Sequence, residues 1–350
     1  MRIALVSASA KTRALLRRAA RIGAHELRGS FLEVESALES LREDPPELLV
    51  LEVGAIEGGA LHATKRLVDH VGCPLLLLAR SDDRSIGEVS RALAAGAVDV
   101  VMLPGDAKAE QAMDAVVAKL RTMRRLTRRG CGSAAGTEPG AREPLRGPAP
   151  LVAIGASTGG PQALAAVLSD LPRPFGGAVI AALHIDRAFG SALASWLGET
   201  AGLPCRFARG GERPAVGEVR IAAADEHLVL GADGALDYRA EPSGALHRPS
   251  IDVLFGSLAE HAVGRGVAVL LTGMGRDGAQ GLKALRARGW LTITQDEASS
   301  TVYGMPRAAA QIGAACRVLP LDRIGEALGH AVCERSGPGS RWSRSGGGSG

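Results

Sequence analysis

The sequence predicts an α/β protein with two doubly wound parallel-sheet domains. Short apolar runs alternate with helical patterns over residues 1–120, and a second series of such runs begins after residue 150. Apolar runs of this kind, each followed by a helix, are typical of parallel strands that are covered on both faces. Between the two series lies a stretch rich in Gly, Pro and Ala, residues 130–150, which has the composition of a linker.

The domain boundaries follow from these changes in composition. We expect a small βα domain at residues 1–120, a flexible basic linker at 121–149, a larger domain at 150–334 and a disordered tail at 335–350. The strands of the first domain are predicted at the runs RIALVSA, ELLVLEV, CPLLLLAR and VDVVMLP. The tail cannot bury a core of its own, so no fold is expected there.

The excess positive charge lies outside the predicted domains. The formal net charge is +4, of which residues 121–150 carry +5 and residues 335–350 carry +3, which leaves −4 for the remainder. Nucleic-acid binding requires positive charge gathered on a folded surface, so we expect no nucleic-acid partner. The arginines at 121–129 are interpreted as a solvated linker, with docking to an acidic protein surface as the alternative.

Cysteine use and hydropathy indicate a cytoplasmic protein. The five cysteines form no CxxC pair or regular framework, which fits a reducing compartment. No apolar run approaches the ~20 residues of a membrane span, and the start, MRIALVSAS, is too quickly polar for a secretory segment. No histidine pair has metal-ligand spacing, so we expect neither a metal nor an organic cofactor.

A serine in a glycine-rich turn is the most informative feature of the second domain. The segment LVAIGASTGG places Ser157 between an apolar strand and the predicted helix PQALAAVLSDL. Such a turn aims a hydroxyl outward at the carboxyl edge of a sheet, beside free N–H groups of the next helix. Nucleophilic serines occur there, but glycines after a strand also bind phosphates or simply form a tight corner.

Two later segments repeat this layout and end in a histidine and an aspartate. The apolar run that starts at Ala178 stops at His184. The run at 267–271 enters a glycine-rich loop that carries Asp277. Parallel strands share one carboxyl edge, where open α/β sheets bind their ligands, so we expect Ser157, His184 and Asp277 to converge.

Nucleophilic catalysis by serine requires these three residue types together. An imidazole takes the proton of the hydroxyl, and a carboxylate fixes the tautomer of the imidazole and stabilises its charge. The oxyanion then needs fixed donors, each worth about 2.7–4 kcal/mol, and the backbone N–H groups of residues 273–275 and of Thr158 are the candidates. Taken alone, His184 is more typical of a satisfied histidine at a strand end, and Asp277 of a turn former or helix cap.

Five phrases of the second domain together resemble one family. GASTGGPQAL, ALHIDRAFG, RPSIDVLFGSLA, LLTGMGRDGAQGL and QDEASSTVYGMPRAA occur in the order and spacing of the chemotaxis protein-glutamate methylesterases, the CheB family. The resemblance covers residues 148–331 and implies a Rossmann-like three-layer catalytic domain. The sequence departs from the family after His184, where Met-Pro-Pro is more usual than the Ile-Asp-Arg found here, which leaves the shape of that loop open.

The resemblance also implies a function and assigns roles. It implies a serine hydrolase that removes methyl groups from γ-glutamyl methyl esters of methyl-accepting chemotaxis receptors and also deamidates receptor glutamines. The family's triad falls on Ser157, His184 and Asp277. By the same resemblance, the backbone N–H of Met274 helps to form the oxyanion hole and Thr158 supports the site. The implied partners are the receptors and other chemotaxis signalling proteins, with no insertion into the membrane.

The first domain resembles the receiver of response regulators, but the residues of its phosphorylation site have changed. Receivers carry an acidic pair, a phosphoacceptor aspartate, a Ser or Thr, and a Lys at the ends of successive strands. The matching positions here are Ser7 and Ala8, Glu52, Ala79 and Leu103. A divalent cation loses its oxygen ligands without the acidic pair, and a phosphoryl group loses its counter-ion without the lysine. We therefore expect a pseudo-receiver that takes no phosphate.

Glu52, at the degenerate phosphoacceptor position, allows two interpretations. Its fixed negative charge could mimic a phosphorylated state, or it is a relict acid that caps the next turn. In the family the receiver covers the esterase cleft until phosphorylation frees it. Here we expect control to be absent, constitutive or delegated to a protein partner.

Two other functions stay open from the residues alone. The glycine turn could hold a pyrophosphate in a nucleotide-binding module, although GASTGG lacks the G-x-G-x-x-G spacing and the P-loop lysine. The chain could also be a catalytically silent scaffold that binds receptors. We expect His227, His247 and His261 to be structural or solvated, and we assign no chemistry to Arg248 and Ser250.

Overall fold

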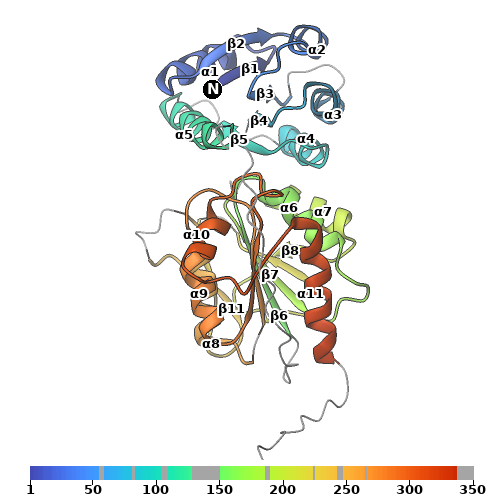
Figure 1. The fold of residues 1–350 in the computed structure, drawn as a ribbon, viewed down its shortest axis with the longest axis vertical. Coiled ribbons are helices and arrows are strands. Elements are labelled where there is room, and N and C mark those ends of the chain that lie inside the picture. The colour runs from blue at the N-terminus through green and yellow to red at the C-terminus, as the bar shows by residue number, and fades with distance from the viewer. Residues whose placement is uncertain are drawn as a thin grey trace, which may run out of the picture.

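The chain folds into two α/β units, which Figure 1 shows one above the other. A computed structural model describes residues 1–54, 59–80, 83–103, 109–127, 150–185, 190–223, 225–242, 247–264 and 266–336. Most of the predicted linker, from residue 128, and the predicted tail from residue 337 lie outside the described residues. None of the described helices is long and apolar enough to span a membrane.

The first unit is a five-stranded parallel sheet with helices on both faces. Its strands lie in the order β2-β1-β3-β4-β5. They are β1 (Arg2–Val6), β2 (Glu26–Phe31), β3 (Leu48–Glu52), β4 (Leu75–Arg80) and β5 (Asp99–Leu103), with helices α1 (Ala10–Ile22), α2 (Val34–Leu41), α3 (Ala60–Val71), α4 (Asp83–Ala94) and α5 (Ala109–Thr127). Alternate residues of the buried strands face α2, α3 and α4 on one side and α1 and α5 on the other. The predicted doubly wound fold is confirmed.

The prediction that the linker starts at residue 121 is wrong. Helix α5 continues to Thr127, and it does so because its apolar spacing continues: Val116, Leu120 and Met123 are all fully buried against the first sheet. Arg124 also donates a hydrogen bond from Nη1 to the Gly23 carbonyl at 3.4 Å. Residues 121–127 therefore belong to the first unit, despite their charge.

The second unit is built on a seven-stranded parallel sheet. Its strands lie in the order β14-β13-β12-β6-β7-β9-β8, and β10 and β11 pair separately as an antiparallel hairpin. They are β6 (Leu151–Ala156), β7 (Ala178–Leu183), β8 (Cys205–Phe207), β9 (Val219–Ile221), β10 (His227–Leu230), β11 (Leu236–Arg239), β12 (Val267–Leu270), β13 (Leu291–Gln295) and β14 (Arg317–Leu319). The central strands are buried on both faces, as the continuous apolar runs predict.

Helices cover both faces of this second sheet and make a three-layer unit (Figure 1). One face packs against α6 (Gly160–Ser169), α7 (Gly190–Ala201) and α11 (Leu321–Ser336). The other packs against α8 (Ile251–His261), α9 (Ala279–Ala287) and α10 (Met305–Gln311). Helix α11 ends two residues beyond the predicted boundary at 334.

The order of the strands creates a switch point at β6. The chain passes from β6 to β7 on one side and later returns to β12 on the other side, so β12, β6 and β7 are neighbours. In open parallel sheets, ligands bind beyond the carboxyl ends of the strands at such a switch point. The loops after these three strands carry Ser157, His184 and Asp277.

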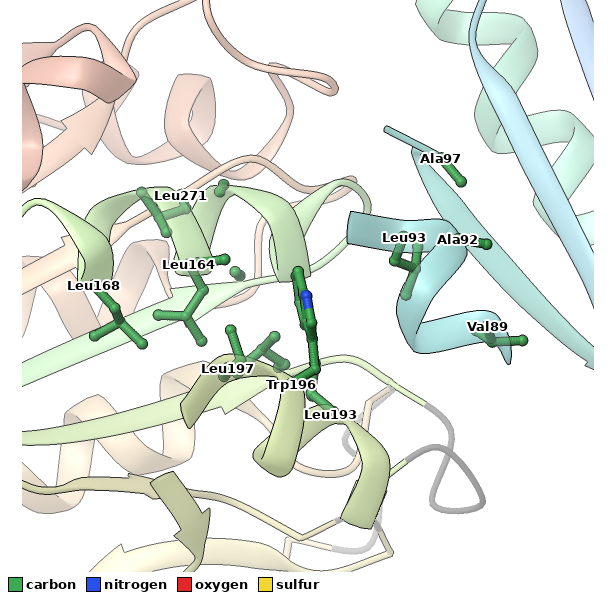
Figure 2. Close-up of a cluster of buried hydrophobic side chains, with 14 of the residues drawn as sticks. Val89, Ala92, Leu93, Ala97, Leu164, Leu168, Leu193, Trp196, Leu197 and Leu271 are labelled. Carbon is green, nitrogen blue, oxygen red and sulfur yellow. The ribbon is translucent and has the colours of Figure 1, made fainter. Parts of the chain in front are cut away.

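The two units contact each other through α4, which lies against α6 and α7 (Figure 2). The buried side chains of Leu93 and Trp196 belong to one apolar cluster that extends through both units. Gln162, in the first turn of α6, donates hydrogen bonds from Nε2 to the carbonyls of Leu93, at 3.3 Å, and Ala97. Because α6 begins directly after the Ser157 turn, this contact lies on the same side of the second unit as the switch point.

Candidate active site

Ser157 lies in a turn whose backbone is fixed at both ends. Its N–H donates to the Thr272 carbonyl at 3.0 Å, and its own carbonyl accepts from Gly160 N–H at 2.7 Å. Gly159 has a φ of 74°, which favours glycine, and a Cβ there would lie 2.5 Å from Thr301 Oγ1. The glycine that follows Thr158 is thus required by the turn, and the turn presents the serine hydroxyl at the sheet edge.

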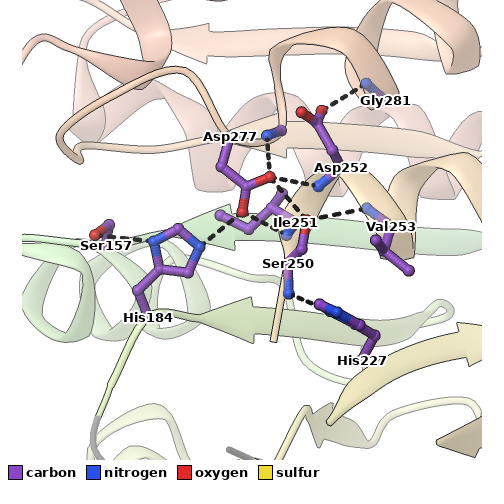
Figure 3. A network of polar contacts seen from close by, with 10 residues as sticks. Ser157, His184, His227, Ser250, Ile251, Asp252, Val253, Asp277 and Gly281 are labelled. Atoms are coloured by element: carbon purple, nitrogen blue, oxygen red, sulfur yellow. Dashed lines mark hydrogen bonds and ion pairs between the residues drawn. The ribbon is translucent and has the colours of Figure 1, made fainter. Parts of the chain in front are cut away.

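His184 connects the serine to the aspartate, as Figure 3 shows. Its backbone N–H donates to the Ala156 carbonyl at 3.1 Å, which holds the end of β7 beside the end of β6. Its Nδ1 lies 3.2 Å from Ser157 Oγ, and its Nε2 lies 2.8 Å from Asp277 Oδ2. The predicted convergence of the three side chains is therefore seen in the structure, although their catalytic roles remain a prediction.

The Asp277 carboxylate is seated at the N-terminus of α8 (Figure 3). Oδ1 accepts from Ser250 Oγ at 2.9 Å and from Asp252 N–H at 3.0 Å, and Oδ2 accepts from Ile251 N–H at 2.8 Å. Free N–H groups and the helix dipole favour an anion at this position. Oδ1 also accepts from Gly278 N–H at 3.1 Å, directly before α9, so the local turn contact expected of Asp277 is present beside the contacts with α8.

The pKa of Asp277 is shifted well below its ordinary value. Burial acts to raise this pKa, but the hydrogen bond from His184 and those from the backbone N–H groups of Asp252 and Ile251 outweigh it. Asp277 is accordingly ionised at neutral pH and can only accept hydrogen bonds. His184 must then carry its proton on Nε2, which leaves the lone pair of Nδ1 facing the Ser157 hydroxyl.

The loop after β12 runs directly against the serine. A Cβ on Gly273 would lie 2.7 Å from Ser157 Cβ, so only glycine allows this approach. The N–H of Gly273 donates to the Val302 carbonyl at 3.0 Å, which removes it from the candidate oxyanion donors. The Gly273 carbonyl accepts from the N–H groups of Gly304, at 3.1 Å, and Met305, at 2.8 Å.

Those two hydrogen bonds also set the direction of the Met274 N–H. The Gly273 carbonyl and the Met274 N–H share one trans peptide unit, so they point in opposite directions. Among the described backbone atoms, no acceptor is found for the Met274 N–H. Thr158 is buried, and its carbonyl accepts from Thr272 Oγ1 at 3.0 Å, which ties the serine turn to the same loop. These contacts fit the predicted oxyanion and support roles of Met274 and Thr158, which stay predictions.

Gly304→Ala should lower activity by disturbing this loop. A Cβ at residue 304 would lie 2.6 Å from the Gly273 carbonyl oxygen and 3.1 Å from Met274 Cα, so the peptide that carries the Met274 N–H must shift. We expect kcat to fall about tenfold to a hundredfold, the cost typical of small displacements at a reacting centre. The matched control is Gly256→Ala in α8, where a Cβ meets no atom within 4 Å. Equal rates for the two variants would show that the loop position does not matter.

Sequence reasoning missed the residues that hold Asp277. Ser250 caps α8 by accepting from Val253 N–H at 3.3 Å and also donates to Asp277, and its own N–H donates to Nδ1 of the buried His227 at 3.0 Å. The serine before an apolar run is a recognisable N-cap signal. That this helix would begin beside Asp277 depends on how α8 packs against α9, which the sequence does not show.

The first unit holds a buried carboxylate at the end of β3. Oε1 of Glu52 accepts from Thr12 Oγ1 at 2.7 Å, and Oε2 accepts from Ser7 Oγ. Both oxygens bond toward β1 and α1. The turn that Glu52 was expected to cap includes residues 55–58, which lie outside the described residues, so that interpretation stays a prediction. At the matching ends of β4 and β5, Ala79 and Leu103 are buried apolar residues.

Fold and site together define an α/β protein that carries Ser, His and Asp in hydrogen-bonded series at the edge of a parallel sheet. Residues 152–328 match the family model described as CheB methylesterase. The chain belongs to the CheB methylesterase family and has a receiver-like N-terminal domain.

Similar proteins cover nearly the whole chain. A Cupriavidus metallidurans protein named protein-glutamate methylesterase/protein-glutamine glutaminase 2 is 42% identical over 337 residues, which is 94% of this chain and 97% of its own. A Mesorhizobium japonicum protein named protein-glutamate methylesterase/protein-glutamine glutaminase is 40% identical and covers 96% of this chain and 100% of its own. The crystal structure of the Thermotoga maritima CheB methylesterase catalytic domain is 33% identical, has a TM-score of 0.50 and covers 52% of this chain and 98% of its own.

Proposed function

We propose that this protein hydrolyses γ-glutamyl methyl esters on methyl-accepting chemotaxis receptors and also deamidates receptor glutamines. The observation that carries the proposal is the series of hydrogen-bonded side chains Ser157, His184 and Asp277 at the switch point. It occurs in a chain of the CheB methylesterase family, whose relatives bear both activities in their names.

The geometry supports an acyl-transfer mechanism. Ser157 Oγ attacks the side-chain carbonyl carbon while its proton passes to Nδ1 of His184, and Asp277 stabilises the resulting imidazolium through Nε2–H. The Met274 N–H faces the negative charge that develops on the carbonyl oxygen. His184 then returns the proton to the leaving group, which is methanol from an ester or ammonia from an amide, and an acyl-enzyme forms.

Water completes the cycle by the reverse sequence of proton transfers. It attacks the acyl-enzyme with His184 as base, and the free glutamate side chain leaves as Ser157 regains its proton. The proposed steps need no metal or organic cofactor. Since the substrate segments are receptor helices in the cytoplasm, we place the enzyme there.

The proposal is tested by methanol release from a methylated receptor fragment, with ammonia release from the unprocessed glutamine form measured in parallel. We expect both products, each with one new carboxylate in the receptor by mass spectrometry. A receptor that binds the protein but is left chemically unchanged would instead support the silent-scaffold alternative.

We further propose that residues 1–127 form a regulatory unit that takes no phosphate and that residues 150–336 form the catalytic unit. The carboxylate at the phosphoacceptor position is buried and already bonded to two hydroxyl groups. Neither the Ser7 and Ala8 pair nor Leu103 supplies the charged groups that phosphoryl transfer uses. Control of the esterase would then come through the contact of α4 with α6 and α7, under the influence of a protein partner.

Incubation with acetyl phosphate and Mg²⁺ should leave the mass of this protein unchanged. The expected result follows from the residues at the matching positions, where Ser7 and Ala8 replace the acidic pair that holds the cation and Leu103 replaces the lysine that pairs with the phosphoryl group. Intact-protein mass spectrometry over minutes to hours provides the measurement. A rapid gain of one phosphoryl group that requires Mg²⁺ and disappears in Glu52→Gln would contradict the assignment.

A further inference from the structure

One ring-stacking contact at the candidate active site lies outside the hydrogen-bonded series of Ser157, His184 and Asp277. The ring of His247 stacks on the ring of His184, with 4.1 Å between ring centroids and an angle of 19° between ring planes. His247 as a residue is exposed, yet one face of its ring is used for this contact. Among the residues that the structure describes, no hydrogen bond to the His247 ring is found.

His247 belongs to a segment that also holds the aspartate. Residues 250–252 follow it closely and bind the Asp277 carboxylate through Ser250 Oγ and the N–H groups of Ile251 and Asp252. This one segment at the start of α8 therefore contacts two members of the proposed triad. The buried ring of His227 fixes the position of this segment, because its Nδ1 accepts a hydrogen bond from Ser250 N–H.

The stack restrains a motion that the two hydrogen bonds of His184 leave free. Both bonds, to Ser157 and to Asp277, are made at the ring nitrogens and fix the two ends of the imidazole in its plane. Tilting of the ring about the line between its nitrogens is not opposed by these bonds. A second ring lying nearly parallel at 4.1 Å blocks that tilt on one side.

The stacked ring is also suited to the charge that the reaction creates. The pKa of His247 is lowered, because burial of the ring and the charge of His184 disfavour its protonated form, while Asp277 acts in the opposite direction. His247 is therefore neutral at neutral pH. A neutral aromatic face attracts a cation, so the contact favours the imidazolium formed when His184 takes the serine proton.

We propose that His247 is a positioning residue of the esterase: its ring keeps the His184 imidazole in the plane in which Nδ1 meets the Ser157 hydroxyl. This proposal rests on the proposed function, since it assigns His184 as the general base. It departs from the expectation that His247 is merely structural or solvated. The sequence offers no sign of the contact, because His247 lies in an irregular segment more than sixty positions from His184.

The test compares His247→Ala, which removes the ring, with His247→Phe, which keeps a stacking face. In the full-length protein we expect His247→Ala to lower kcat about tenfold to a hundredfold with little change in KM, because the base is displaced rather than the substrate. The His247→Phe variant, by contrast, should have a kcat near the wild-type value. His330→Ala, at an exposed histidine on α11, is the matched control and should leave kcat unchanged.

A second measurement separates this proposal from the assignment of the substrate. The rate at which a fluorophosphonate labels Ser157 reports how strongly the hydroxyl is activated, whether or not a receptor is turned over. We expect the labelling rate to fall in His247→Ala and to recover in His247→Phe, with equal melting temperatures for all variants. Wild-type labelling without release of methanol would contradict the proposed substrate, and the labelling rates would still decide the role of His247.

Two results would overturn the proposal. Labelling of His247→Ala at the wild-type rate would show that the ring does not affect the base. Labelling of His247→Phe as slow as that of His247→Ala would show that stacking is not the property that matters.

Discussion

Ser157→Ala should reduce kcat for ester hydrolysis by about 10⁶, the loss seen when the nucleophile of a serine hydrolase is removed. The substitution deletes only Oγ. Both backbone hydrogen bonds that fix the turn, from Ser157 N–H to Thr272 and from Gly160 N–H to Ser157, are kept. We therefore expect an unchanged melting temperature together with loss of methanol release from the methylated receptor.

The control for this variant is Ser169→Ala, at the other end of α6. The Ser169 hydroxyl donates to the Ala165 carbonyl of its own helix at 2.8 Å and to the Thr200 carbonyl of α7 at 3.3 Å, and it has no contact with the three site residues. That variant should retain full activity. A Ser157→Ala protein with a tenth or more of the wild-type rate would mean that another group attacks the ester, and the proposed mechanism would be wrong.

Asp277→Asn should reduce kcat by about 10⁴, the effect that loss of the triad carboxylate has elsewhere. Both Asp277 oxygens accept from donors: Oδ2 from His184 and Ile251, and Oδ1 from Ser250 and Asp252. An amide must place its NH₂ group against one of these sets of donors. Either the tautomer of His184 or the start of α8 is disturbed, so a loss of stability should accompany the loss of rate.

The stability effect of Asp277→Asn should depend on pH. The pKa of Asp277 is lowered in the folded protein, so its ionised form contributes stability above its unfolded pKa of about 3.9. That contribution is lost as the pH falls below about 4 toward the folded value. The difference in unfolding free energy between wild type and variant, measured by urea titration, should be constant near pH 7 and shrink below pH 4. A difference that stays constant down to pH 2.5 would contradict the role given to the N-terminus of α8.

The parts of the fold and site that could be predicted are those encoded by local sequence. The central buried strands are continuous apolar runs, and glycines follow β6 and β12 closely, so the positions of Ser157, His184 and Asp277 at one edge followed from strand direction. The same logic placed Glu52 at the end of β3.

The parts that escaped prediction depend on packing between distant segments. The charge of residues 121–127 suggested a linker, but burial of Leu120 and Met123 in the core of the first unit keeps α5 helical. Ser7 and Thr12 were not expected as partners of Glu52, because only the folded sheet brings β1 and α1 beside β3. His247 likewise reaches His184 only after α8 has docked on the second sheet.

The hydrogen bonds that position the Asp277 carboxylate determine which substitutions the site can tolerate. Three of its donors, at residues 251, 252 and 278, are main-chain groups, which every residue except proline possesses. Substitutions of side chains in the first turn of α8 would preserve these backbone N–H donors, so the position of the carboxylate tolerates most point mutations there. Only a proline, or an insertion that displaces the turn, would release the carboxylate.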